Sequence, residues 1–184
     1  MKIISASLIC IFLFTIFGCS SVTVRTDYDP EYDFNIFKTY RWASAQEINP
    51  DDELAKNPLV LKRVQASIDN QLKSKGFSLS ESGETDLVAI AHAGVKDRMQ
   101  VYNTGGYYGG WYDPWWGPYG GSTHVSYYEE GTLVIDFVVW EKKELAWRGM
   151  GTKVLSDNPN PDKIQREIDH IVEKIMAGFP PKAK

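Results

Sequence analysis

The stretch TLVIDFVVWEKKELAWRGMGTKV, residues 132–154, decides the fold of this chain. In its first half every second residue is apolar, at Leu133, Ile135, Phe137 and Val139. The polar residues 141–144 then have the length of a hairpin connection, and a second strand-like run follows at 145–154. Alternation with a period of two predicts an antiparallel hairpin with one covered face.

Further strand-like runs surround this hairpin along the chain. They lie at 22–28, 37–42, 77–82 and 87–95. The first strand of the hairpin itself is predicted at 125–140. The polar residues 44–56 predict a loop. A hydrophobic content of 43% and a charged content of 24% are ordinary for a globular chain, so the runs predict one sheet in a single domain.

Two amphipathic helices are predicted, at 58–75 and from 161 to about 178. Each follows an Asn-Pro pair, in which the Asn side chain is expected to accept hydrogen bonds from free backbone amides while Pro occupies a first-turn position. Apolar residues recur at spacings of three and four along each helix. We therefore expect an α+β fold, a two-layer sandwich in which an antiparallel β-sheet packs against two amphipathic helices.

Residues 1–18 have the pattern of a signal peptide, because their apolar run of about 15 residues is shorter than the roughly 20 that span a bilayer. The run ends in IFGC, residues 16–19, which resembles the lipobox of bacterial lipoproteins. Cys19 is therefore the expected lipidation site, with palmitate as the expected kind of acyl group. Ser20 resembles a signal for outer-membrane sorting, so we expect an outer-membrane protein facing the periplasm if the source has two membranes.

Residues 19–184 are expected to form one lipid-anchored globular domain. The net charge of -4 comes without a basic stripe, which argues against nucleic acid as a partner. Cys10 leaves with the signal peptide, so no disulfide is expected in the mature chain. The expected partners are the membrane, through the anchor, and either an envelope protein or a cell-wall glycan. No cofactor is expected.

Residues 102–121 have an unusual composition, with seven Gly, five Tyr, three Trp and two Pro. Gly makes the backbone permissive, and Tyr and Trp supply amphipathic rings. Contact with lipid headgroups, stacking on cell-wall glycan and docking of a protein partner all fit this loop. The simpler interpretation is a low-complexity loop that folds back on the sheet. The candidate contact residues are Tyr107, Tyr108, Trp111, Tyr112, Trp115, Trp116 and Tyr119.

Asp136 is the most informative carboxylate, because it lies in an apolar strand and needs a hydrogen-bond donor there. Arg148, across the predicted hairpin, is the expected donor. We interpret the two residues as a structural pair, and the functional alternative is a polar pair that binds in a groove. The three histidines lie far apart in sequence, so no metal site is expected.

Familiar catalytic signatures are missing from the sequence. It contains no nucleophile elbow, no HExxH pair, no free thiol in the mature chain and no phosphate-cradling glycine loop. We therefore expect a non-enzymatic binding or structural module of the cell envelope. The alternative is a small periplasmic hydrolase or lipid-handling enzyme built around Asp136 and His92.

Four short motifs carry a family resemblance. They are TDYDP at 26–30, FKTYRW at 37–42, EGTLVID at 130–136 and WRG at 147–149. Together they resemble domain of unknown function 4136, a family of bacterial lipoproteins, over nearly all of the mature chain. The resemblance implies an envelope lipoprotein and assigns no activity, because the motifs are structural in character.

Overall fold

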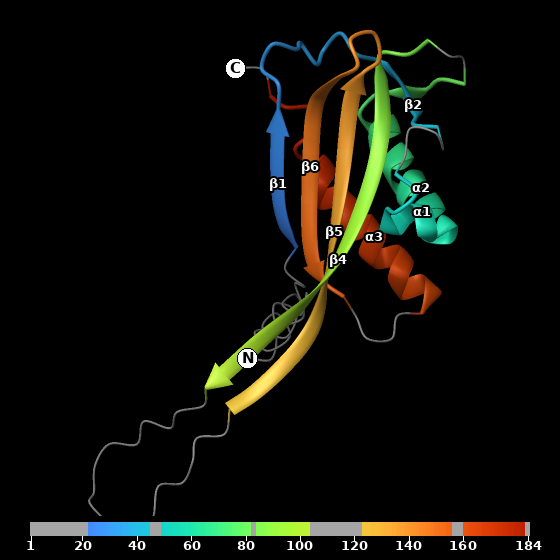
Figure 1. Ribbon diagram of the computed structural model, residues 1–184. Helices are drawn as coiled ribbons and strands as arrows, with labels where there is room; N and C mark the ends of the chain where they lie inside the picture. Colours follow the sequence, from blue (N-terminus) through green and yellow to red (C-terminus); the bar gives the residue numbers. More distant parts are fainter. Residues whose placement is uncertain (1–21, 45–48, 82–83, 104–122, 156–159, 183–184) are drawn as a thin grey trace, which may run out of the picture.

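The computed structural model describes residues 22–44, 49–81, 84–103, 123–155 and 160–182. This described part forms one six-stranded sheet and three helices (Figure 1). The predicted α+β fold is confirmed. In chain order the elements are β1 (Thr23–Tyr28), β2 (Thr39–Trp42), α1 (Glu53–Lys56), α2 (Pro58–Ser74), β3 (Ser78–Leu79), β4 (Leu87–Asn103), β5 (Thr123–Val139), β6 (Glu144–Val154) and α3 (Pro161–Met176).

The sheet is mixed, with the strand order β1-β6-β5-β4-β2-β3. The strands β1, β6, β5 and β4 are antiparallel neighbours, as the alternation predicts. By contrast, β2 runs parallel to both β3 and β4, so the antiparallel prediction does not hold for these two pairs. Parallel neighbours need a crossover connection, and the helices α1 and α2 supply it between β2 and the strands that follow.

Helix α1 corrects the prediction of a loop at 44–56. Its single turn begins after Asp52, whose side chain accepts a hydrogen bond from the Leu54 N–H at 2.8 Å. An Asp ahead of an acidic first turn is an N-cap signal, which the polar composition of the run obscures. Leu54 is buried in the core and holds this turn against the sheet.

The two long helices begin where predicted but are capped differently. At α3 the Asn160 side chain accepts a hydrogen bond from the Lys163 N–H at 2.8 Å, which confirms the predicted cap. At α2 the Asn57 side chain makes no cap bond, and its amide donates to the Glu53 carbonyl at 2.8 Å instead. The predicted Asn57 cap is wrong because α1 runs directly into α2 and offers that side chain a carbonyl acceptor.

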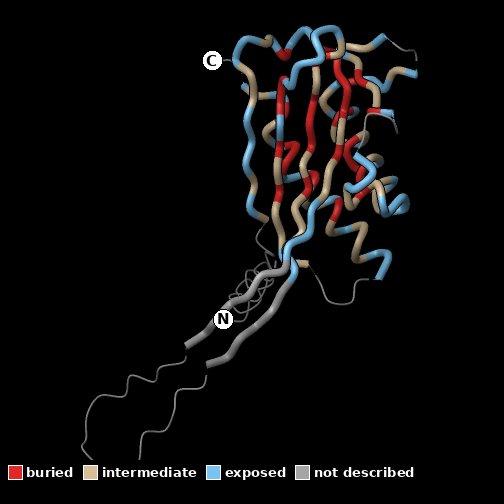
Figure 2. Tube along the Cα trace, in the orientation of Figure 1, coloured by how far each residue is buried: buried red, intermediate tan, exposed pale blue. Residues whose placement is uncertain are grey.

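All three helices cover the same face of the sheet (Figure 1). The buried positions follow the strands β4, β5 and β6 and the helix sides turned toward them (Figure 2). Within β5 the helix-facing residues are the four that the alternation predicts, and each is at most 7% exposed. The core cluster joins them to Ile68 and Leu72 of α2 and to Val172 and Ile175 of α3.

One end of the two layers is filled by aromatic rings, and we call it the closed end. Phe179 lies among them, with its ring centroid 4.2 Å from Phe137, 5.1 Å from Trp147 and 5.4 Å from Phe77. Phe34 packs edge-on against the Phe179 ring at 6.0 Å. All five rings are buried, so solvent does not reach the core at this end.

The opposite end carries an extension of two strands, and we call it the ribbon end. The last row shared by β4, β5 and β6 contains Lys96, Glu130 and Val154. Beyond that row, within the described residues, β4 and β5 pair only with each other, as far as Asn103 and Thr123 (Figure 1). At about 3.4 Å per residue, this two-stranded ribbon reaches about 25 Å past the sheet.

Candidate functional site

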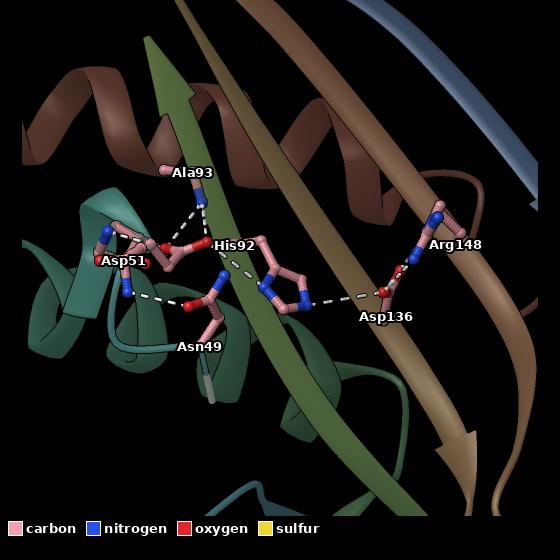
Figure 3. Close-up of polar contacts among 8 residues, drawn as sticks. Asn49, Asp51, His92, Ala93, Asp136 and Arg148 are labelled. Carbon is pink, nitrogen blue, oxygen red and sulfur yellow. Dashed lines mark hydrogen bonds and ion pairs between the residues drawn. The ribbon is translucent and has the colours of Figure 1, made fainter. Parts of the chain in front are cut away.

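Four polar side chains form a chain across the sheet, which we call the polar array (Figure 3). Asp136 of β5 and Arg148 of β6 are register partners on the face that the helices leave open. They face that side because Ile135 and Phe137, the residues next to Asp136 in sequence, face the helices. His92 of β4 and Asp52 ahead of α1 extend the array to the sheet edge.

The contact between Asp136 and Arg148 is a two-pronged hydrogen bond. Arg148 Nε donates to Asp136 Oδ1 at 2.7 Å, and Arg148 Nη2 donates to Oδ2 at 2.6 Å. The Asp136 side chain is 5% exposed and the Arg148 side chain 46% exposed, so the guanidinium compensates a buried charge and still reaches solvent. The hydrogen bonds to Asp136 raise the pKa of the Arg148 guanidinium, although its partial burial acts in the opposite direction.

His92 connects this pair to the edge of the sheet. Its Nδ1 lies 3.4 Å from Asp52 Oδ2, and its Nε2 lies 3.8 Å from Asp136 Oδ2. Both distances exceed the usual length of a hydrogen bond, so these are contacts of charge with charge when the ring is protonated. The imidazole is about one-third exposed and therefore accessible from solvent.

Asp52 is the member of the array that the sequence analysis missed. Besides capping α1, it accepts a hydrogen bond from the Ala93 N–H, which lies 3.1 Å from Oδ1 and 3.3 Å from Oδ2. This amide is available because β2 pairs with β4 only between Leu87 and Ala89, which leaves the following part of β4 at the sheet edge. The N-cap signal locates Asp52 at a helix start, but its contact with β4 follows from the topology alone.

The carboxylates of the polar array are already hydrogen-bonded, and its two cationic or basic groups reach solvent. Arg148 engages both oxygens of Asp136, and Asp52 is occupied by backbone amides. In acid–base catalysis the proton acceptor is most often an accessible imidazole, and within the array His92 is that group. Here the two carboxylates beside His92 already have donors, and the array presents a guanidinium and an imidazole to solvent.

The other predicted site residues lie outside the described residues. They are Cys19 and the seven aromatic residues Tyr107, Tyr108, Trp111, Tyr112, Trp115, Trp116 and Tyr119. Their roles in lipidation and in ring contacts stay predictions. The strands that flank the aromatic segment are described, and they pair Asn103 with Thr123.

Two further findings concern the described ranges alone. Within them, no three His, Cys, Asp or Glu side chains are grouped as metal ligands would be. Across the same ranges, no helix combines the length and the apolar character needed to cross a bilayer.

The fold and the polar array define a class of small α+β domain, with one helix layer on a mixed sheet and a buried acid–guanidinium pair on the other face. The chain belongs to the family described as Domain of unknown function (DUF4136), whose sequence model matches residues 24–181. This match confirms the resemblance carried by the four motifs. A comparison with curated protein sequences finds no match.

Solved structures match this chain at low sequence identity. A PDZ domain protein from Parabacteroides distasonis matches with a TM-score of 0.56 and 12% identity, over 88% of this chain and 36% of that chain. Two PelC dodecamer structures from Paraburkholderia phytofirmans match with TM-scores of 0.49 and 0.46, at 10% and 11% identity. Both matches cover 85% of this chain. They cover 96% of the PelC chain in the first structure and 95% in the second. The first likeness shows the fold alone.

Proposed function

We propose that the chain is a lipid-anchored protein of the bacterial cell envelope that acts as a non-enzymatic binding module at the membrane surface. The observation that supports this proposal is the shared position of two features. Thr23, at the start of β1, lies in one row with Thr152 and Thr132, two rows before the last row shared by β4, β5 and β6 at the ribbon end. The chain therefore enters the domain at the end from which the ribbon extends.

Distances along the chain make this arrangement specific. Cys19 precedes Thr23 by four residues, which span at most about 14 Å when fully extended. A lipid on Cys19 would hold Thr23, the start of β1, within that distance of the bilayer surface. The ribbon reaches about 25 Å past the sheet on the same side and leads into the Tyr- and Trp-rich residues 102–121. Because Trp and Tyr favour the membrane interface, contact with lipid headgroups is the function we assign to this segment.

The polar array supports the non-enzymatic part of the proposal. Its most buried member, Asp136, has both oxygens engaged by Arg148 and is not available as a base. The competing class, a small periplasmic hydrolase or lipid-handling enzyme, has one observation in its favour, since the imidazole of His92 lies 3.8 Å from Asp136. Replacement of His92 by Ala should leave every envelope phenotype unchanged. Loss of function in a stably folded His92→Ala chain would favour the enzyme.

The anchor is tested with the full chain expressed in bacteria that are fed an alkyne-tagged palmitate. Wild-type protein should acquire the tag and fractionate with membranes, and Cys19→Ser should lose the tag because the acceptor sulfur is gone. In a host with two membranes, Ser20→Asp should move the protein from the outer to the inner membrane on a density gradient. An untagged wild-type chain in the soluble fraction contradicts the proposal.

Membrane contact of the aromatic segment is tested by quenching. Full-length protein is reconstituted through its anchor into phosphatidylcholine vesicles that contain brominated acyl chains, which quench Trp emission at short range. The matched control replaces Trp111, Trp115 and Trp116 by Phe, so that only Trp42, Trp140 and Trp147 of the folded domain emit. Strong quenching in the wild type that is mostly lost in the control supports membrane contact. Equal quenching in both proteins, or none in the wild type, assigns the segment to glycan or protein partners instead.

A further inference from the structure

A cavity of about 520 Å³ lies between the helix layer and the sheet at the ribbon end. Aliphatic side chains from α2, α3, β5 and the residue after β6 make up most of its wall. They include Val60, Val64, Leu133, Leu155, Ile164 and Ile168. Its size falls within the range of about 300–1,000 Å³ that is usual for small-ligand sites.

Small residues from β4 and β5 form part of the cavity wall. Ala93, Gly94 and Gly131 line it where larger residues would close the gap. Protein interiors are normally packed to the density of organic crystals, with few voids larger than a water molecule. This cavity is open to solvent on one side, and its mostly apolar wall suits an apolar ligand better than water, which needs several polar partners.

Charged groups at the cavity point to the polar part of that ligand. Lys153 is only 12% exposed at its side chain and forms an ion pair with Glu167 at 3.3 Å. Glu53, which forms an ion pair with Lys56 at 3.0 Å, and the exposed Glu129 also line the cavity, so with Lys56 counted its carboxylates outnumber the cations by one. A partly buried ammonium paired with Glu167, with further carboxylates on the cavity wall, complements a headgroup that carries both signs, with a phosphate toward Lys153 and an amine toward the glutamates. A purely anionic headgroup would meet an excess of like charge.

We propose that this cavity binds one acyl chain of a zwitterionic membrane phospholipid such as phosphatidylethanolamine. The inference rests on the proposed function for access, because anchoring through Cys19 brings the ribbon end to the lipid surface. Thr132 lines the cavity and is two strands from Thr23, a lateral distance of about 10 Å. A neighbouring lipid in the same leaflet is therefore within reach of the cavity while the protein stays anchored.

The test uses the full chain in vesicles that contain phosphatidylethanolamine with a diazirine at the end of one acyl chain. After illumination, labelled peptides are mapped by mass spectrometry, and label is expected on α2, α3 and the end of β5. Ile168→Trp places an indole in the cavity and should lower this labelling about tenfold, equivalent to about 1.4 kcal/mol. Leu59→Trp makes a similar change at a residue of the same helix layer that is 75% exposed, and it should label like the wild type.

Ile164→Trp provides a second filling variant at a partly buried position, in case Ile168→Trp does not fold. Unfolding by urea identifies which variants retain the native structure. Equal cavity labelling in the wild type and in a folded filling variant overturns the proposal. A phosphatidylglycerol probe that labels as strongly as phosphatidylethanolamine overturns the assignment of a zwitterionic headgroup.

The occupant could also come from the anchor of the protein itself, and a Cys19→Ser arm distinguishes that source. If the anchor filled the cavity, the wild type would stay unlabelled there and Cys19→Ser would gain label, which overturns a membrane lipid as the occupant. The mass of the amino-terminal peptide reports lipidation of Cys19 in the same samples. An unmodified Cys19 together with a labelled cavity contradicts the anchoring proposal while leaving the cavity site standing.

Discussion

The closed end and the ribbon end are built from the same sheet and the same helix layer, but they are packed differently. Around Phe179, aromatic rings fill the space between the layers. At the ribbon end, aliphatic side chains and small strand residues leave a cavity of about 520 Å³. Dense packing stabilises a fold, whereas an unfilled apolar space lowers stability and makes room for a ligand. The contrast indicates that stability is concentrated at the closed end, and the ribbon end has the space for the ligand that we propose.

The largest expected effect comes from opening the closed end. Phe179→Ala removes a ring that contacts at least four others, and it should lower the free energy of unfolding by about 4 kcal/mol. Urea denaturation followed by Trp emission measures this change. Ile168→Ala at the cavity wall is the counterpart and should cost about 2 kcal/mol, because its side chain borders space that is already empty. Equal costs would show that the two ends do not differ in energy.

The Asp136–Arg148 pair lies between the two ends and gives the next largest effect. Arg148→Met leaves the buried Asp136 carboxylate without its partner and should destabilise the fold by about 3 kcal/mol. Combining it with Asp136→Asn removes the charge that needs compensation and should recover most of that loss. Thermal or urea unfolding of the three proteins checks both statements. A single Arg148→Met chain as stable as the wild type would mean that the pair does not stabilise the sheet.

A pair of glycine substitutions compares the two ends with the same added methyl group. At Gly149, a Cβ would collide with the side chains of Trp147 and Ile175 in the packed core, so Gly149→Ala should cost about 2 kcal/mol. At Gly131, the Cβ would lie 2.7 Å from Leu155 Cδ2, a side-chain end that borders the cavity and has room to move. Gly131→Ala should therefore change stability by less than about 1 kcal/mol. Similar losses for both variants would contradict the difference in packing.

Asp86 gives the smallest effect and a dependence on pH. At the closed end its Oδ2 accepts hydrogen bonds from the Lys38 N–H at 2.7 Å, the Thr39 N–H at 2.8 Å and the Thr39 hydroxyl at 2.9 Å. Burial alone would raise the pKa of this carboxyl group, but the hydrogen bonds outweigh burial and lower it. Since the folded pKa lies below the ordinary value of 3.8, the stabilisation is present above that value and is lost as pH falls through the lowered pKa.

Asp86→Asn should therefore cost about 1 kcal/mol at neutral pH, where the wild-type carboxylate is ionised. The difference between the two proteins should disappear near pH 2. Urea denaturation at the two pH values measures both quantities. A difference that persists unchanged in acid would assign the effect to the shape of the side chain rather than to its charge.

The elements that the sequence predicts are those whose signal is local. The alternation around Asp136 gave the correct covered face of β5, and the Asn-Pro pairs gave the starts of α2 and α3. The short hairpin brings Asp136 and Arg148 close together, but their register depends on an irregularity between Phe137 and Val138 that the sequence pattern does not predict, since an unshifted hairpin would place Asp136 opposite Trp147. Periodicity and turn length are properties of neighbouring residues, so they can be read without knowledge of the rest of the chain.

The remaining features depend on segments that meet only after folding. The parallel pairing of β2 requires the crossover through α1 and α2, and the contact of Asp52 with His92 and Ala93 requires α1 to pack against the exposed edge of β4. The cavity likewise depends on how far two helices stand from small residues on the sheet. The amino-acid sequence thus determined the class of fold, the family and the need of Asp136 for a donor, because local periodicity and short motifs carry that information. Only the tertiary structure decided which side chains meet in the polar array and how far the helices stand from the sheet at the ribbon end. Long-range packing of the chain sets both.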